Sequence, residues 1–372
     1  MISTAPKKIV LDIAKSLDDE RATGYIRGPL HGILVTDNIC TYVCLRIDTT
    51  RGSYALVGSI PQHNAPLVDH LLKEGMTIIG KANLSEMSGW KGFGITTGWS
   101  VVGGQTKSPY IVGEPAKGEK LLGQTAPARS SSGSASGAAA GFAPLAIATE
   151  TDGSITQPAN RAALFGIKIT VGRASTEGTA PWSALTDSIG GMAKSAQDLA
   201  DLVNFILSTN ITPTLNTSWK GQTVGFVDDT LWGFSEPIYT RDPVLITQQR
   251  EAYIDTKKKL IEHGATLHEN VPLTSVDELQ LDDHDHAKAW EKFLKNFPSS
   301  SMKSIADIVK SNKLNANVAL PAEDPGQQLL ESALGDKMSE EKYAEGVLLI
   351  PTEPGNISAE IQPPKVKVPR RG

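Results

Sequence analysis

One stretch, residues 128–158, constrains the fold of this chain more than any other part of its 372-residue sequence. It reads ARSSSGSASGAAAGFAPLAIATETDGSITQP: a serine- and glycine-rich run, an alanine-rich segment, a short apolar segment and a polar turn that presents Ser154. The small side chains predict a loop and a closely packed helix, and PLAIA predicts a buried strand. A flexible Ser/Gly linker is the alternative interpretation. Because a linker does not usually end in a strand and a sharp turn, the stretch predicts a built site.

Helical and strand patterns alternate on both sides of this stretch. Residues 7–23 predict an amphipathic helix, and residues 64–84 predict a helix, a glycine stop and a buried strand. Ser195 is expected to cap a helix over residues 196–207, and residues 223–271 predict a second strand–helix–strand unit. This alternation predicts an α/β fold with a large, mixed, mostly parallel sheet covered by helices.

Composition limits the compartment and the partners. Hydrophobic residues make up 40% of the chain, enough for a large core, and the net charge of −5 disfavours a nucleic-acid partner. Cys40 and Cys44 are the only cysteines, too few for a disulfide framework. No 18-residue apolar run or signal-peptide core is present, so we expect no membrane association and a cytoplasmic location.

Several familiar site patterns fail on their details. Residues 113–120, GEPAKGEK, begin like a phosphate-binding loop but carry Glu119 and Lys120 where Lys and Ser/Thr are needed. In GSASG, Ala135 occupies the nucleophile position of an α/β-hydrolase elbow. The Asp/His cluster at residues 282–286 is expected to form a solvated polar face rather than a metal site. We therefore expect no cofactor and no metal.

Five segments occur in the order typical of one hydrolase family: GPLHGILVTDNI, GKANLSEMSGW, GGQTKSPY, SSSGSASGAAAGFAPLAIATETDGSITQPANRAALFGIKITVGR and DSIGGMAKSAQDLADL. They resemble the amidase signature family, which cleaves amide C–N bonds with a Ser-Ser-Lys triad, and are most similar to its peptide-amidase-like and fungal members. The resemblance implies one amidase-like domain over residues 1–372, with a large mixed sheet covered by helices. It is strong over a core at residues 8–210, which contains the signature stretch 128–160. Residues 211–355 form a looser, shortened remainder, and residues 356–372 a tail.

The resemblance also assigns roles within the signature stretch. It implies that Ser154 is the nucleophile and that Ser130 is the bridging serine, which is held by a cis peptide bond in the family. Their 24-residue separation (154 − 130) matches the family spacing. The oxyanion hole is expected to consist of backbone N–H groups, those of Thr151, Asp152, Gly153 and Ser154.

The third member of the triad is replaced. The family has a lysine directly before its Asp-Asn pair, whereas this chain has Thr36 before Asp37 and Asn38, and two residues appear deleted after Ile33. A buried neutral lysine accepts the proton of the nucleophile through the bridging serine, and a threonine hydroxyl cannot do this near pH 7. Lys81 corresponds to a lysine outside the family triad, so we do not expect it to substitute.

Three hypotheses follow from this departure. The first is a hydrolase of a small amide or a peptide amide whose activity is impaired by Thr36. The second is a catalytically silent homologue that binds instead. The third is a product truncated at both ends that has no function. The expected partner is a small-molecule or peptide amide, and the expected state is a monomer or a homodimer.

Overall fold

The structure is a computed structural model, which describes residues 1–37, 47–116, 119, 123, 125–212, 215, 218–227, 242–271, 284, 286–336 and 338–349. The chain divides into two compact units. The first comprises Met1–Leu215 and Asp282–Asp336, and the second Asn216–Leu281 and Lys337–Gly372. The single domain expected over residues 1–372 therefore stays a prediction.

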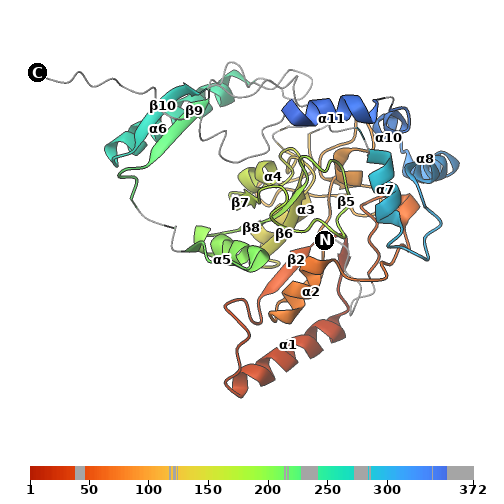
Figure 1. Cartoon of the computed structure of the whole chain (residues 1–372), viewed down its shortest axis with the longest axis horizontal. Coiled ribbons are helices and arrows are strands. Elements are labelled where there is room, and N and C mark those ends of the chain that lie inside the picture. Colours follow the sequence, from red (N-terminus) through yellow and green to blue (C-terminus); the bar gives the residue numbers. More distant parts are fainter. Residues whose placement is uncertain are drawn as a thin grey trace, which may run out of the picture. The chain divides into compact units, whose positions relative to one another are not determined.

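The first unit contains most of the secondary structure (Figure 1). Its strands are β1 (Ser3–Thr4), β2 (Leu34–Asp37), β3 (Thr77–Lys81), β4 (Trp99–Ser100), β5 (Gly104–Gln105), β6 (Leu145–Glu150), β7 (Phe165–Lys168) and β8 (Ser188–Ala193). Its α-helices are α1 (Lys7–Ala22), α2 (Pro66–Lys73), α3 (Ser132–Ala139), α4 (Thr156–Arg161), α5 (Ala196–Leu207), α7 (His286–Leu294), α8 (Ile305–Leu314), α9 (Ala316–Ala319) and α10 (Gln328–Ala333). Two short 3₁₀ helices are η1 (Tyr54–Leu56) and η2 (Glu86–Gly89).

A six-stranded sheet with the order β1-β3-β2-β6-β8-β7 organises this unit. β2 is parallel to both β3 and β6, whereas the pairs β1–β3, β6–β8 and β7–β8 are antiparallel. The predicted mixed sheet is confirmed, but the prediction that it is mostly parallel is wrong for the described strands. The reason is β8, which lies between β6 and β7 and runs opposite to both. No helix separates β7 from β8, so the chain returns antiparallel instead of crossing over.

The side chains of β6 alternate between two apolar layers. The larger layer contains Leu145 and Ile147 with side chains of α2 and α5: Leu67, Val68, Leu71, Leu199 and Leu202. The smaller layer contains Ala148 with side chains of α3 and α4: Ala135 and Ala159. Because successive strand residues point to opposite faces, α2 and α5 cover one face of the sheet, and α3 and α4 cover the other. The helices of the signature stretch, α3 and α4, therefore lie on the face with the smaller side chains.

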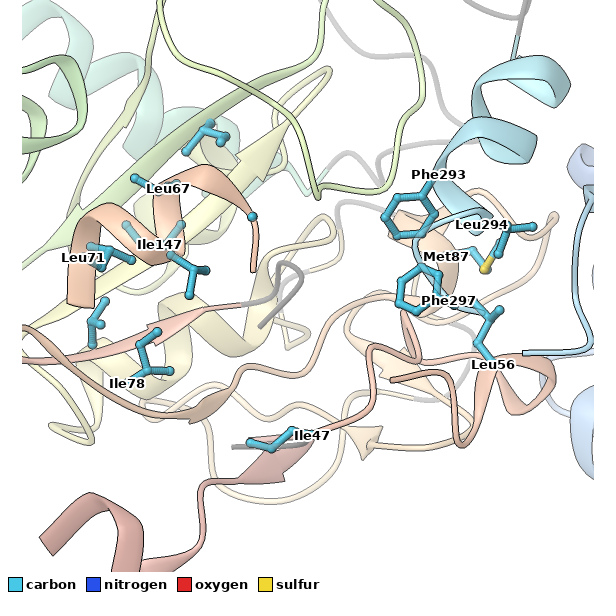
Figure 2. Close-up of a cluster of buried hydrophobic side chains, with 14 of the residues drawn as sticks. Ile47, Leu56, Leu67, Leu71, Ile78, Met87, Ile147, Phe293, Leu294 and Phe297 are labelled. Atoms are coloured by element: carbon cyan, nitrogen blue, oxygen red, sulfur yellow. The ribbon is translucent and has the colours of Figure 1, made fainter. Parts of the chain in front are cut away.

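The larger apolar layer continues towards α7 (Figure 2). Figure 2 shows Leu71 and Ile147 in one part of the cluster and aromatic side chains with Leu56 and Met87 in the other. The rings of Phe293 and Phe297 pack edge to face, with centroids 5.1 Å apart. Burial of such side chains contributes roughly 1.5–3 kcal/mol each, so α7 is held to the first unit by apolar contacts.

The second unit is a separate strand–helix–strand motif. β9 (Thr223–Val227) and β10 (Thr266–Val271) form a two-stranded parallel sheet, and α6 (Pro243–Glu262) connects them. This motif was predicted. α11 (Glu340–Leu349) also belongs to this unit. The apolar run VLLIPTEPG at residues 347–355 predicts a last strand from the sequence, but residues 347–349 lie in α11. That prediction is wrong for these three residues, because they continue the polar helix before them. In the described part of the chain, no helix is long and apolar enough to cross a bilayer.

The first turn of α3 has no room for a side chain at Gly133. Its N–H group donates a hydrogen bond to the Asn83 carbonyl oxygen at 3.0 Å. A Cβ atom there would lie 2.3 Å from that oxygen and 2.4 Å from the Asn83 nitrogen. At Gly137, one turn later, the nearest neighbour of a Cβ atom would be a ring carbon of Phe142, 3.6 Å away. The glycine at 133 is therefore required by packing and the one at 137 is not.

We predict that Gly133→Ala lowers the free energy of unfolding by about 1–3 kcal/mol, because the backbone must shift to admit the methyl group. Gly137→Ala is the matched control in the same helix. It should leave stability unchanged or raise it by up to about 1 kcal/mol, since alanine favours helix over glycine. Urea unfolding followed by circular dichroism measures both. Equal stability of the two variants would contradict the packing argument.

Candidate active site

Ser154 lies in the tight turn between β6 and α4, where the sequence places the nucleophile. The turn is fixed by Glu150, whose Oε2 atom accepts hydrogen bonds from the N–H groups of Ile155 at 2.6 Å and Thr156 at 2.8 Å. The Thr156 hydroxyl donates to the same oxygen at 3.2 Å. Ser154 is buried. Because Glu150 satisfies the donors after Ser154, the start of α4 is held by a local carboxylate.

The N–H groups of Gly153 and Ser154 differ from those that follow them. Within the described residues they have no hydrogen-bond acceptor. Thr151, which precedes them in the turn, is anchored by two hydrogen bonds. Its hydroxyl donates to Asp187 Oδ1 at 2.6 Å, and Lys168 Nζ donates to its carbonyl oxygen at 2.6 Å. Two neighbouring, unpaired N–H groups on a fixed turn are the arrangement that stabilises an oxyanion.

Asp187 supports this turn from the loop before β8. Its Oδ2 atom accepts the N–H groups of Trp182 at 2.6 Å and Ser183 at 3.0 Å, in addition to the Thr151 contact through Oδ1. Burial raises the pKa of Asp187 above its ordinary value, and these hydrogen bonds oppose the increase. The residue was not identified from the sequence, since it lies 36 residues from Thr151.

The segment of Ser130 runs beside the nucleophile turn. The Ser131 N–H group donates to the Ser154 carbonyl oxygen at 3.2 Å, and the Ser85 N–H group donates to the Ser130 carbonyl oxygen at 3.1 Å. Ser130 is buried. In the part of the chain that is described, no hydrogen bond joins the hydroxyls of Ser130 and Ser154. The structure therefore brings the two backbones together without connecting the two hydroxyl groups.

The cis peptide bond expected at Ser130 is not present. Every peptide bond of the described residues is trans, and the turn is made instead by Ala128 and Arg129, with φ angles of 58° and 41°. A trans bond before a non-proline residue is favoured by about 3–4 kcal/mol. Two consecutive left-handed residues provide the change of direction with trans bonds, so the cis-serine prediction is wrong for this structure.

No hydrogen bond joins the Thr36 hydroxyl to either serine within the described residues. The polar residues at 36–38 predict a turn after a buried strand, but Thr36 lies inside β2, level with Ala146 of β6 and Gly80 of β3. Its hydroxyl is buried and has no hydrogen-bond partner among the described residues. The turn prediction is wrong here because the strand continues to Asp37, the residue before the undescribed segment. Asn38, Cys40 and Cys44, also named in the sequence-based predictions, lie outside the described residues.

Lys81 is one register position beyond Thr36 in the sheet, opposite Asp37. Its side chain is buried, and its ammonium group donates to the hydroxyl of Thr49. This hydrogen bond ties the Lys81 ammonium group to Thr49. No hydrogen bond joins Lys81 to either serine within the described chain.

Histidines 284 and 286 do not form the predicted solvated face. Both are buried: His284 Nδ1 lies 2.8 Å from Asp336 Oδ2, and His286 Nδ1 lies 3.2 Å from the Trp182 carbonyl oxygen. Burial lowers the pKa of His286. The solvated-face prediction is wrong for these two residues: His286 lies on the buried side of α7, which packs into the core, and His284 is buried beside Asp336. The three aspartates of this cluster are outside the described residues, and among those described no group of His, Cys, Asp and Glu could hold a metal.

Comparison with known proteins identifies the family. The sequence profile of the amidase family matches residues 2–281. The chain belongs to this family. A putative amidase of Schizosaccharomyces pombe is 42% identical over 191 residues, which are 51% of this chain and 30% of that protein. A putative amidase of Arthroderma benhamiae is 37% identical over 198 residues, covering 53% of this chain and 31% of the relative.

Solved amidase structures share the fold. The peptide amidase of Stenotrophomonas maltophilia has a TM-score of 0.73 and 29% identity, covering 93% of this chain and 69% of the other. An amidase family protein of Bacillus anthracis has a TM-score of 0.76 and 27% identity, covering 93% and 67%. The predicted amidase signature fold and the resemblance to fungal and peptide-amidase-like members are confirmed. The matched part of this amidase family chain spans less than a third of the two curated relatives.

A buried ion pair lies close to the site in this member of the amidase family, and the sequence did not reveal it. Glu86 follows Ser85, which bonds to the Ser130 segment, and its Oε1 atom lies 3.1 Å from Lys91 Nζ. Both side chains are fully buried, and the Lys91 ammonium also donates to the carbonyl oxygen of Ala319. Burial raises the pKa of Glu86 to about 7, although the charge of Lys91 opposes the increase.

We predict a pH-dependent stability term from Glu86. Between its ordinary pKa of 4.5 and about 7, the folded chain holds a proton that the unfolded chain has lost. Stability from this group is therefore complete below pH 4.5 and is lost as the pH rises to 7. The free energy of unfolding of the unmodified chain, minus that of Glu86→Gln, should fall by about 3 kcal/mol across this window. Urea unfolding at several pH values measures the difference.

The control for this titration is Glu177→Gln, which changes an exposed carboxylate. The same subtraction with this variant should give a much smaller dependence on pH. A flat difference for Glu86→Gln would show that Glu86 stays ionised in the folded chain.

Proposed function

We propose that this chain hydrolyses carboxamide C–N bonds slowly, with Ser154 as the nucleophile and Ser130 as the bridging serine. The observation that carries the proposal is the pair of unpaired N–H groups at Gly153 and Ser154, on a turn fixed by Glu150. Membership of the amidase family supports the reaction class. The substrate is proposed to be a small amide or a peptide amide, and the peptide amidases among the structural relatives support the second class.

In the proposed reaction, the Ser154 Oγ atom attacks the carbonyl carbon while its proton passes to Ser130, and Ser130 passes its own hydroxyl proton on towards the leaving nitrogen. The carbonyl oxygen becomes an oxyanion, which accepts hydrogen bonds from the N–H groups at 153 and 154. Loss of one such donor typically costs about 10²–10³ in rate. The C–N bond then breaks, the leaving amine takes a proton, and water hydrolyses the Ser154 ester to release the carboxylic acid.

The proposed activity is low because no lysine is present at position 36 to accept the proton of Ser154 during the attack. Thr36 occupies the position of the family lysine, and its hydroxyl remains protonated near neutral pH. Loss of one member of a catalytic triad costs about 10⁴–10⁶ in rate in subtilisin, and the oxyanion donors and substrate binding account for the residual activity. Lys81 is engaged by Thr49 and is not proposed as a replacement.

The second candidate function is binding without turnover. The buried Thr36 hydroxyl favours it, because the chain retains the turn but not the base. Under either function, the monomeric or homodimeric state and the cytoplasmic location remain predictions.

We predict that Thr36→Lys raises kcat/KM for amide hydrolysis by at least about 10²-fold, since a buried lysine has a lowered pKa and supplies the missing base. Thr36→Met is the matched control, because it adds a side chain of similar length without an amine. Release of ammonia or amine from a simple carboxamide and from a peptide amide measures activity. Equal gains from lysine and methionine would contradict the assignment of a base to this position.

Ser154→Ala provides the complementary test. It should abolish hydrolysis both in the unmodified chain and in Thr36→Lys, because the attacking oxygen is lost. High activity of the unmodified chain that disappears in Ser154→Ala would overturn the impaired activity but keep the nucleophile. Activity that persists in Ser154→Ala would overturn the proposed nucleophile.

A further inference from the structure

We infer that Arg129 is a positioning residue that orients the oxyanion donor of Gly153. The inference deepens the proposed function and rests on it, because it concerns the same oxyanion. Arg129 directly precedes Ser130, and its side chain reaches across to the nucleophile turn. Its Nη2 atom donates to the Asp152 carbonyl oxygen at 2.8 Å and to Asp152 Oδ2 at 2.5 Å.

The carbonyl contact fixes an N–H group because the two belong to one peptide unit. The Asp152 C=O and the Gly153 N–H lie in the same plane and point in opposite directions. A hydrogen bond that holds the carbonyl towards Arg129 therefore holds the N–H group away from it. This N–H group has no acceptor within the described chain, so its direction is fixed while it stays available to an oxyanion.

Gly153 makes such a tie necessary. Its φ angle is 102°, and glycine adopts positive and negative φ angles with similar ease. The peptide unit before Gly153 can therefore rotate at low cost, and rotation would turn the N–H group away from the reacting carbonyl. Arg129 opposes this rotation by bonding to the carbonyl. The same logic applies one residue earlier, where Lys168 holds the Thr151 carbonyl and hence the direction of the Asp152 N–H group.

The two contacts of Arg129 differ in weight. The Asp152 side chain is 64% exposed, whereas the Arg129 side chain is 23% exposed. Water screens an exposed carboxylate, so the ion pair contributes little. The hydrogen bond from the guanidinium to the peptide carbonyl carries the positioning, because it acts on the backbone directly, and the guanidinium charge also polarises the peptide so that the N–H group becomes a stronger donor.

The test measures the rate at which a fluorophosphonate labels Ser154 in the full chain, because this reaction needs both the nucleophile and the oxyanion donors. Arg129→Met should lower the second-order rate constant at least about tenfold, a part of the loss expected for a missing donor. Arg129→Lys should restore most of it, since lysine can still donate to the carbonyl.

Arg21→Met is the matched control for loss of an arginine. Arg21 makes the same two kinds of contact away from the site: Nη2 donates to the His31 carbonyl oxygen at 3.0 Å, and Nη1 lies 3.3 Å from Asp18 Oδ1. Its replacement should leave the labelling rate unchanged. Thermal unfolding of both methionine variants separates a stability effect from an orientation effect, and Arg129→Met should melt within a few degrees of the unmodified chain.

Two results would overturn the inference. The first is labelling of Arg129→Met at the rate of the unmodified chain. The second is slow labelling that Arg129→Lys does not restore and that accompanies a large loss of thermal stability, which would indicate a merely structural arginine. If Ser154 of the unmodified chain is not labelled at all, the proposed function fails. Amide hydrogen exchange of the peptide over residues 150–157 then tests whether Arg129 holds the turn through the Asp152 carbonyl, because Arg129→Met should accelerate exchange there and Arg21→Met should not. Unchanged exchange would overturn it.

Discussion

The close approach of α3 to β6 is the contact on which the site depends. The Ser131 hydroxyl donates to the Thr149 carbonyl oxygen at 3.1 Å, and the Ser134 hydroxyl donates to the Ile147 carbonyl oxygen at 3.0 Å. Only small side chains allow a helix to bond to strand backbone in this way. The first turn of α3 is thereby held beside the end of β6, and the Ser130 segment meets the turn of Ser154.

The turn that carries Ser154 is held by charged groups with different roles. The carboxylates of Glu150 and Asp187 accept from donors that follow or flank the turn, while the cations of Lys168 and Arg129 donate to its carbonyl oxygens. A cation that holds a carbonyl group fixes the direction of the N–H group in the same peptide unit, and the Gly153 N–H group fixed in this way has no acceptor among the described residues. The electrostatic arrangement therefore favours negative charge on one side of the turn without any metal ligand.

Local signals allowed much of this fold to be predicted. The Ser195 cap is present, since its hydroxyl accepts the Asp198 N–H group at 3.0 Å, and the helix, glycine stop and strand of residues 64–84 are confirmed. Contacts between residues far apart in sequence left no such signal. The direction of β8, the Asp187–Thr151 bond and the burial of His286 each depend on how distant segments pack, so periodicity could not reveal them.

In the described chain, Thr36 makes no hydrogen bond that would hold the turn of Ser154. Among the described residues, no hydrogen bond joins its hydroxyl to the turn, and Glu150, Asp187, Lys168 and Arg129 hold that turn from other elements. Under the proposed function, the replacement of the family lysine by Thr36 therefore removes a proton acceptor without removing a structural support. The proposed loss of catalytic rate leaves the geometry around Ser154 in place, because the groups that position the proposed nucleophile are not the group proposed to activate it.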